Sequence, residues 1–204
     1  MSLEVKNLGF YYQKNNWIIK DVNLTVDQGE IVGIVAPSGY GKTTLGKIIA
    51  GYIKPVTGEV LLNGKNISET KGFNPIQMAH QHPEKSINIR WKINKILNEG
   101  WEVSKDIKDK FGIKEDWLNR WPTELSGGEL QRICLSRILS PNTQFLIADE
   151  ITTMIDAITQ VQLCNVLMDL SKKQGLGILF ITHNKYLIEK VSDRVLNLKE
   201  LNKR

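Results

Sequence analysis

A glycine-rich loop with the composition of a phosphate-binding site follows an apolar stretch near the N-terminus. Residues 31–35 predict a buried strand, and residues 36–44 read Ala-Pro-Ser-Gly-Tyr-Gly-Lys-Thr-Thr, which nearly fits the pattern GxxxxGK(S/T). Gly39 and Gly41 would let the backbone turn its N–H groups inward around phosphate oxygens. Lys42 would then reach the β- and γ-phosphates, and Thr43 would hold Mg²⁺. The predicted nucleotide-binding residues are Ser38, Gly39, Tyr40, Gly41, Lys42, Thr43 and Thr44.

Two adjacent carboxylates end a second apolar stretch. Residues 145–148 predict a buried strand, and Asp149 and Glu150 follow it directly. Two carboxylates at a buried strand end are costly unless a cation lies nearby, so we expect Asp149 to hold Mg²⁺ through water. Glu150 projects in another direction and is expected to accept the proton of an attacking water. The alternative is a solvated acidic pair with no part in catalysis.

Histidines occur at two places where chemistry is expected. His183 comes directly after the predicted strand 178–181, at the carboxyl edge where α/β sheets bind ligands. His80 and His82 would share a face of an extended chain, but two ligands on a loop make an incomplete metal site. We therefore assign His183 to the phosphate chemistry and give the other two no role.

A second glycine motif opens a helix far along the chain. Residues 125–132 read Leu-Ser-Gly-Gly-Glu-Leu-Gln-Arg, which resembles the signature sequence of ABC ATPases. The chain is similar to that family in its other motifs, in order along the sequence: Gln81 of the Q-loop, Asp149 and Glu150 of the Walker B strand, Asp156 at the end of the D-loop, and His183 of the histidine switch. The resemblance covers almost the whole chain.

This resemblance implies roles for residues outside the loop. Ser126, Gly127, Gly128 and Asp156 would close over ATP bound to a second subunit, so the active form would be a homodimer or heterodimer with two ATP molecules between its halves. Gln81 would take part in catalysis and contact Mg²⁺, and His183 would contact the γ-phosphate. Tyr12 is the expected adenine-stacking residue, with Tyr11 as the alternative because strand alternation sends the two to opposite faces.

The neighbourhood of Gln81 resembles one branch of the family. Residues 81–90 are similar to a run found in the ATPases of oligopeptide, dipeptide and nickel importers, although Ile87 and Ile89 replace its Leu and Pro. The implied function is ATP hydrolysis that powers import of peptides, nickel or a metal chelate, with the pore in separate permease chains. The alternatives are a soluble non-transport ABC ATPase and a hydrolysis-poor partner subunit of a heterodimer.

Several residues depart from the family pattern. Ala36 replaces the first glycine of the loop, which is tolerable only if this position needs no positive φ. Ile151 stands where the family usually has Pro, and Thr153-Met154 replaces the Ser-Ala of its D-loop. These departures could slow turnover, but every motif carboxylate, Lys, Gln and His is present.

Composition narrows the class of protein. The net charge is +5, from 27 basic and 22 acidic residues spread along the chain, so no nucleic-acid partner is expected. No leader and no apolar run long enough for a membrane span is evident, so we expect a cytoplasmic protein peripheral to the membrane face. Cys134 and Cys164 lie singly in helical patterns and are expected to be reduced core residues.

The order of patterns predicts an α/β fold, a P-loop NTPase of ABC type. Strand and helix alternation after residue 126 predicts a mainly parallel sheet with helices on both faces. Alternating residues near the N-terminus, with Asn63-Gly64 as a hairpin turn, predict an antiparallel β portion. We expect one domain over 1–204, with the nucleotide-binding core in 1–82 and 126–204 and an inserted helical lobe in 83–125.

Overall fold

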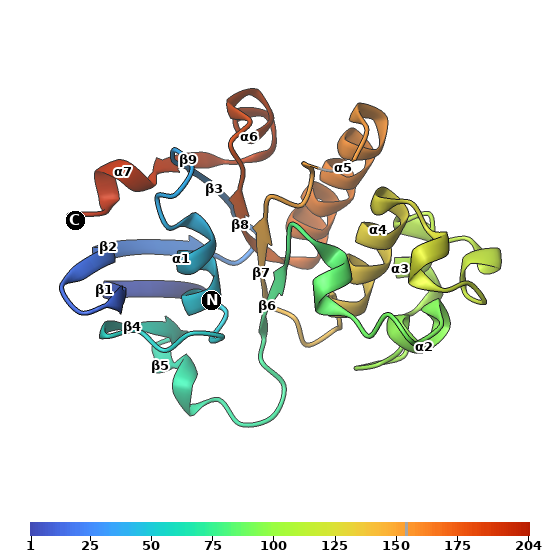
Figure 1. The fold of residues 1–204 in the computed structure, drawn as a ribbon, viewed down its shortest axis with the longest axis horizontal. Helices are drawn as coiled ribbons and strands as arrows, with labels where there is room; N and C mark the ends of the chain where they lie inside the picture. The colour runs from blue at the N-terminus through green and yellow to red at the C-terminus, as the bar shows by residue number, and fades with distance from the viewer. Residues whose placement is uncertain (154) are drawn as a thin grey trace.

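A computed structural model describes residues 1–153 and 155–204 (Figure 1). The strands are β1 (Ser2–Gln13), β2 (Asn16–Asp27), β3 (Ile31–Val35), β4 (Thr57–Leu62), β5 (Lys65–Asn66), β6 (Ile76–Ala79), β7 (Phe145–Asp149), β8 (Gly177–Ile181) and β9 (Arg194–Asn197). The helices are α1 (Lys42–Ile49), α2 (Ile93–Leu97), α3 (Lys105–Lys110), α4 (Gly127–Ile138), α5 (Ala157–Gln174), α6 (Lys185–Val191) and α7 (Leu198–Leu201).

A five-stranded parallel sheet forms the centre of the molecule. Its strand order is β6-β7-β8-β3-β9, and every pair in it is parallel. Strands β7 and β8 are buried along their whole length, as expected for a sheet covered on both faces. Because all strands run the same way, the segments after β3, β6, β7 and β8 meet at one edge, and this edge carries the predicted chemistry.

The antiparallel β portion is confirmed. A four-stranded sheet in the order β2-β1-β4-β5 lies at the left of Figure 1. Asn63 and Gly64 both have positive φ, 52° and 77°, which is the backbone of the predicted tight turn between β4 and β5. One apolar cluster joins this sheet to α1 and to one face of the parallel sheet, with Leu3, Leu45 and Phe145 fully buried in it.

The segment predicted to be a helical lobe contains less α-helix than its pattern indicated. Only α2 and α3 are α-helices between β6 and α4; a 3₁₀ turn at 83–86 precedes them, and two more at 115–117 and 122–124 follow them. Gly112, at φ 60°, and Pro122 interrupt the helical pattern. Trp117 is buried here, and its cluster runs without a break into the second face of the parallel sheet. The boundaries at 83 and 125 stay a prediction.

Helix α4 follows the second glycine motif, as predicted. The Ser126 side chain accepts a hydrogen bond from the Glu129 backbone N–H, and the Glu129 carboxylate accepts one from the Ser126 N–H, so the start of the helix is doubly capped. Leu130, Ile133 and Cys134 are buried, and the half-buried Ile138 packs against the same cluster. Leu135 is buried too, because α4 is covered on two sides, by the sheet and by α2.

Both cysteines are confirmed as buried thiols. Cys134 and Cys164 are unpaired, and burial raises the pKa of each to about 11. They are therefore protonated at neutral pH and poor nucleophiles. In the described part of the chain, no helix is both long and apolar enough to cross a bilayer.

Candidate nucleotide site

The loop between β3 and α1 has the backbone that phosphate binding needs. Gly39 and Gly41 have φ of 75° and 87°, and Gly41 is the residue immediately before α1. A Cβ at Gly41 would come within 2.8 Å of Ile18 Cγ2, so this position excludes any side chain on two grounds. Ala36 is not among the described residues with positive φ. The first departure from the glycine pattern therefore costs the loop nothing in backbone strain.

Lys42 ties the loop together through two backbone carbonyls. Its Nζ donates to the carbonyl of Ala36 at 2.8 Å and to that of Pro37 at 3.2 Å. The ammonium group thus lies across the mouth of the loop, next to the N-terminal end of α1. The positive charge of the lysine and the positive end of the helix dipole both lie at the loop, so an anion is stabilised there.

Asp149 is a buried carboxylate with an unpaired oxygen. The residue is 3 % exposed, and its Oδ1 has no hydrogen-bond partner. Burial raises the pKa of Asp149 and the charge of Glu150 raises it further, while a hydrogen bond with the Thr43 side chain acts in the opposite direction. A divalent cation would satisfy the orphaned oxygen and offset the buried charge. The oxygen donors of Asp149 and Thr43 fit Mg²⁺, which prefers such ligands.

Glu150 and His183 form a pair at the ends of β7 and β8. His183 Nδ1 lies 2.9 Å from Glu150 Oε2, with the histidine side chain largely exposed and the glutamate side chain nearly buried. Glu150 has φ 52°, a left-handed conformation that costs a non-glycine residue about 1 kcal/mol or more. Its N–H donates to the carbonyl of Ile181 at 2.9 Å, which holds the turn in place. The strained turn directs the carboxylate toward the loop.

An open cavity of about 410 Å³ brings most of the predicted residues together. Its lining residues come from the ends of β2, β3, β6, β7 and β8, and they are Ile18, Ser38, Gly39, Gly41, Lys42, Thr43, Thr44, Gln81, Glu150 and His183. All but Ile18 were predicted. Ile18 belongs to an alternating strand pattern in the antiparallel sheet. Nothing in that pattern indicates that the Ile18 side chain packs against Gly41. A larger cavity of about 590 Å³, lined by the C-terminal end of α1, the segment after it and β4, contains none of the predicted residues.

A second cavity adjoins the first and shares Thr43 and Gln81 with it. It measures about 330 Å³, includes Asp149, and has basic side chains from Lys47 and Lys85. His80 and His82 line it as well. His80 packs beside Tyr52, and burial lowers its pKa. The described residues contain no group of three His, Cys, Asp or Glu arranged to bind a metal.

The signature residues lie apart from this site. Ser126, Gly127, Gly128 and Asp156 line a third cavity of about 330 Å³, which has no residue in common with the nucleotide cavity. Asp156 is the cap of α5, and the hydrogen bond that it accepts from the Thr159 N–H lowers its pKa. The predicted site is therefore divided between two surfaces of one chain.

The predicted aromatic residues do not line the nucleotide cavity. Tyr12 is 63 % exposed and packs edge-on against Phe10, with 4.9 Å between ring centroids. Tyr11 packs against Trp17 on the other side of the strand, so alternation separates the two tyrosines as expected. Tyr40 lies beneath the guanidinium of Arg204, 4.0 Å from its ring. The adenine-stacking role of Tyr12 stays a prediction.

The family model described as ABC transporter matches residues 19–153, about two thirds of the chain. The chain belongs to the ABC transporter family. An oligopeptide transport ATP-binding protein, OppF, of Streptococcus mutans is 36 % identical over 216 residues, covering 95 % of this chain and 70 % of that protein. A dipeptide transport ATP-binding protein, DppF, of Lactococcus lactis is 34 % identical with the same coverage. Members of this family bind and hydrolyse ATP, and this chain is accordingly an ATPase.

Solved ABC cassettes share the fold. A dimeric ATP-binding cassette in a post-hydrolysis state bound to ADP and Pi superposes with a TM-score of 0.82 at 22 % identity, over 99 % of this chain and 97 % of that one. The cassette cbiO1 from Clostridium perfringens gives 0.80 at 22 % identity, over 96 % and 83 %. These likenesses confirm the α/β class with its parallel and antiparallel sheets.

Two of the residues near Glu150 that depart from the ABC pattern, Ile151 and Thr153, make defined contacts in the structure. Ile151 is buried in the core cluster that covers the second face of the sheet. The Thr153 hydroxyl donates to the carbonyl of Glu150 at 2.9 Å and accepts from Gln81 Nε2 at 3.4 Å, so it links the Q-loop to the strained turn. Met154 lies outside the described residues.

Proposed function

We propose that this chain is the ATP-hydrolysing subunit of an importer for peptides. The single observation that carries the ATPase part is the cavity in which Lys42, Glu150 and His183 face one another. Support for peptides comes from relatives named for oligopeptide and dipeptide transport that align with nearly the whole chain. Nickel or a metal chelate, the other expected cargo, has no such support.

The proposed chemistry divides among groups at the sheet edge. Lys42 and the loop N–H groups bind the β- and γ-phosphates, and Glu150 accepts the proton of the attacking water. His183 orients the Glu150 carboxylate through their hydrogen bond and contacts the γ-phosphate. Gln81 positions the attacking water. The hydrogen bond from Gln81 to Thr153 keeps the Gln81 side chain beside the turn at Glu150. Mg²⁺, held by Thr43 and Asp149 with Gln81, would neutralise phosphate charge.

A second ATPase subunit completes the proposed site. Ser126, Gly127, Gly128 and Asp156 line a cavity of their own, so within one chain they do not contact the nucleotide bound at Lys42. In a head-to-tail pair, this surface of one subunit would cover the nucleotide of the other. The partner is a second copy or a related ATPase, and permease chains would hold the pair at the cytoplasmic membrane face.

We expect ATP to drive association of the Glu150→Gln variant, since the γ-phosphate would bridge two subunits and the lost base would keep them closed. Ser126→Asp should abolish the dimer, because aspartate still caps α4 but places negative charge against that phosphate. Ser104→Asp, the same change at the cap of α3, is the matched control and should leave the dimer intact. Light scattering with ATP and with ADP makes the measurement.

If the Glu150→Gln variant stays monomeric with ATP, the homodimer is excluded. Mixing with a related ATPase encoded nearby would then have to restore association. If neither sample associates while ATP still binds, the two-subunit site is wrong for this protein.

The transport proposal is tested in cells. Deletion of the gene should prevent growth when oligopeptides supply an essential amino acid, and free amino acid should restore growth. The wild-type gene should complement the deletion and Glu150→Gln should not. Normal growth of the deletion strain on oligopeptides would contradict peptide import, whether or not the strain has lost the uptake of some other solute. Unchanged uptake of every solute with persistent ATPase activity would favour the soluble non-transport alternative.

A further inference from the structure

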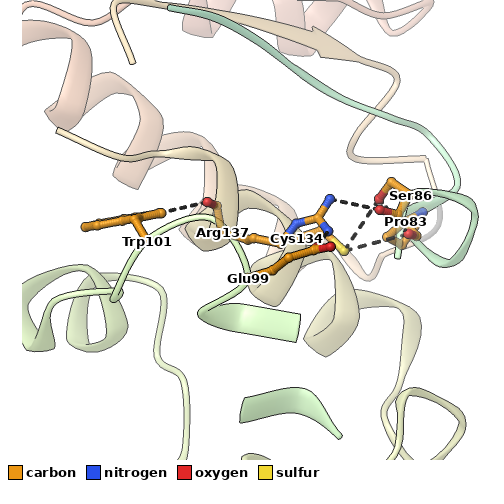
Figure 2. Close-up of polar contacts among 6 residues, drawn as sticks. All are labelled: Pro83, Ser86, Glu99, Trp101, Cys134 and Arg137. Atoms are coloured by element: carbon orange, nitrogen blue, oxygen red, sulfur yellow. Dashed lines mark hydrogen bonds and ion pairs between the residues drawn. The ribbon is translucent and has the colours of Figure 1, made fainter. Parts of the chain in front are cut away.

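Arg137, near the C-terminal end of α4, joins three segments that are far apart in sequence (Figure 2). Its Nη2 donates to the carbonyl of Ser86 at 2.8 Å, and its Nη1 donates to the Glu99 carboxylate at 2.7 Å. The indole N–H of Trp101 donates to the Arg137 carbonyl at 2.8 Å. The Arg137 side chain is 16 % exposed and that of Glu99 is 45 % exposed, so the arginine is shielded from water while its carboxylate partner lies nearer the surface.

The Ser86 end of this network leads back to the nucleotide site. Residues Pro83–Ser86 form a 3₁₀ turn that begins two residues after Gln81, and the Ser86 hydroxyl donates to the Pro83 carbonyl at 2.8 Å. The Cys134 thiol, one turn before Arg137 on α4, contacts the same carbonyl at 3.7 Å. Helix α4 thus holds both ends of the turn that follows Gln81.

The other end of α4 begins at the signature residues. Ser126 caps the helix, and residues 127–136 lie between this cap and Arg137. Close-packed interiors transmit strain, so a displacement at one end of this packed helix is passed toward the other. Through Glu99 and Trp101 the same arginine also holds the segment after α2.

We propose that Arg137 is a positioning residue that couples the segment after Gln81 to the signature helix and to the segment 98–103. When Gln81 moves toward the γ-phosphate, the turn 83–86 moves with it and displaces the C-terminal end of α4. The placement of Ser126, Gly127 and Gly128 then depends on whether the nucleotide cavity is filled. This inference rests on the proposed ATP site and goes beyond it by naming the link.

An arginine is required because two acceptors in different directions must be held at once. The planar guanidinium presents donors in a fixed fork, one to the backbone carbonyl and one to the carboxylate. A lysine at this position keeps the charge but places one flexible ammonium between the two acceptors. The neutral isostere Glu99→Gln leaves the bond to Ser86 in place. Arg137→Met removes both guanidinium bonds, so these three substitutions remove different parts of the network.

Arg194 offers a matched control elsewhere in the fold. Its guanidinium also bonds one carboxylate and one carbonyl, those of Glu30 at 2.6 Å and Thr25 at 2.6 Å. It lies on β9 beside Val32, at the end of the parallel sheet opposite the nucleotide edge. Arg194→Met should lower thermal stability without changing the turnover of folded protein, as expected for an arginine that only stabilises.

The test compares these variants by steady-state kinetics and by amide hydrogen exchange. Arg137→Met should lower kcat by about tenfold to hundredfold through misplacement of Gln81, with KM for ATP within about twofold of wild type. Arg137→Lys should fall between Met and wild type, and Glu99→Gln should stay close to wild type. The coupling would be overturned if ATP affinity in Arg137→Met fell by the same factor as kcat. Equal losses of kcat in Arg137→Met and Arg194→Met would overturn it as well.

Hydrogen exchange decides the matter without turnover. In the Glu150→Gln background with ATP, amides in 36–44, 98–103 and 126–130 should be protected relative to the apo protein. Adding Arg137→Met should retain protection of 36–44 and abolish it at 98–103 and 126–130. Retained protection at all three segments would overturn the proposal. Absence of ATPase activity in the wild type would instead contradict the proposed function, since the exchange result needs only ATP binding.

Discussion

Glu150→Gln should lower ATP hydrolysis by about 10²-fold or more while ATP binding is kept, because a positioned general base contributes about that factor. Glutamine is isosteric with glutamate, so the 2.9 Å contact with His183 Nδ1 can persist as a neutral hydrogen bond. The variant also keeps a non-glycine residue in the left-handed turn at φ 52°, so the backbone strain is unchanged. Single-turnover hydrolysis and equilibrium ATP binding, measured on the same preparation, separate chemistry from affinity.

Glu189→Gln is the matched control for this prediction. Glu189 lies exposed on α6 and outside the nucleotide cavity, so the same chemical change there should leave turnover within about twofold, as for most exposed substitutions. If Glu150→Gln hydrolyses ATP at the wild-type rate, Glu150 is not the base. If it loses ATP binding as well, the glutamate acts on ground-state affinity and the assignment also fails.

The sequence specified the parallel core well because its strands are buried on both faces. Runs such as 145–148 and 178–181 are continuously apolar, and this pattern has few other interpretations in a chain that alternates strand and helix. The turn at Asn63-Gly64 was predictable from two residues, since few residue pairs adopt positive φ twice in succession. Element ends are less certain from sequence: α7 begins at Leu198, directly after β9 ends at Asn197, with no turn residue between them.

The segment 91–121 was harder to predict because its apolar residues follow no single helical face. Short helices and 3₁₀ turns there owe their stability to packing of Trp117 and its neighbours onto the sheet. Propensity alone does not encode such tertiary contacts. For the same reason, no sequence pattern indicated that Arg137 would reach Ser86 and Glu99, which are 51 and 38 residues away.

The candidate site was predictable where backbone conformation or strand order determines it. Gly41 must be glycine because of its φ and the approach of Ile18, and Glu150 and His183 meet because β7 and β8 are adjacent and parallel. Ile18 was missed because a residue of the antiparallel sheet enters the site only through the way the two sheets pack. The sequence predicted that Asp149 is a costly buried carboxylate. It did not indicate that its Oδ1 has no hydrogen-bond partner, because this depends on how the side chains around the strand end pack.

Lys42→Ala should abolish measurable ATP binding and lower turnover by about 10²–10³-fold, the usual cost of removing one preorganised group from a charged transition state. The structure gives this substitution a second consequence. Lys42 also bonds the Ala36 and Pro37 carbonyls, so alanine leaves the loop without these two contacts. The loop should therefore exchange its amides faster in the apo variant than in the apo wild type.

Thermal unfolding gives a direct measurement of the lost affinity in Lys42→Ala. ATP at about 100 times its Kd stabilises a protein by about 2.7 kcal/mol, which raises Tm by about 5–10 °C in a chain of this size. The wild type should show that rise and Lys42→Ala should show none, while Lys65→Ala, an exposed lysine on β5, should behave as wild type. A full ATP-dependent rise in the Lys42→Ala sample would mean that phosphate binds elsewhere, and the charge argument for the loop would be wrong.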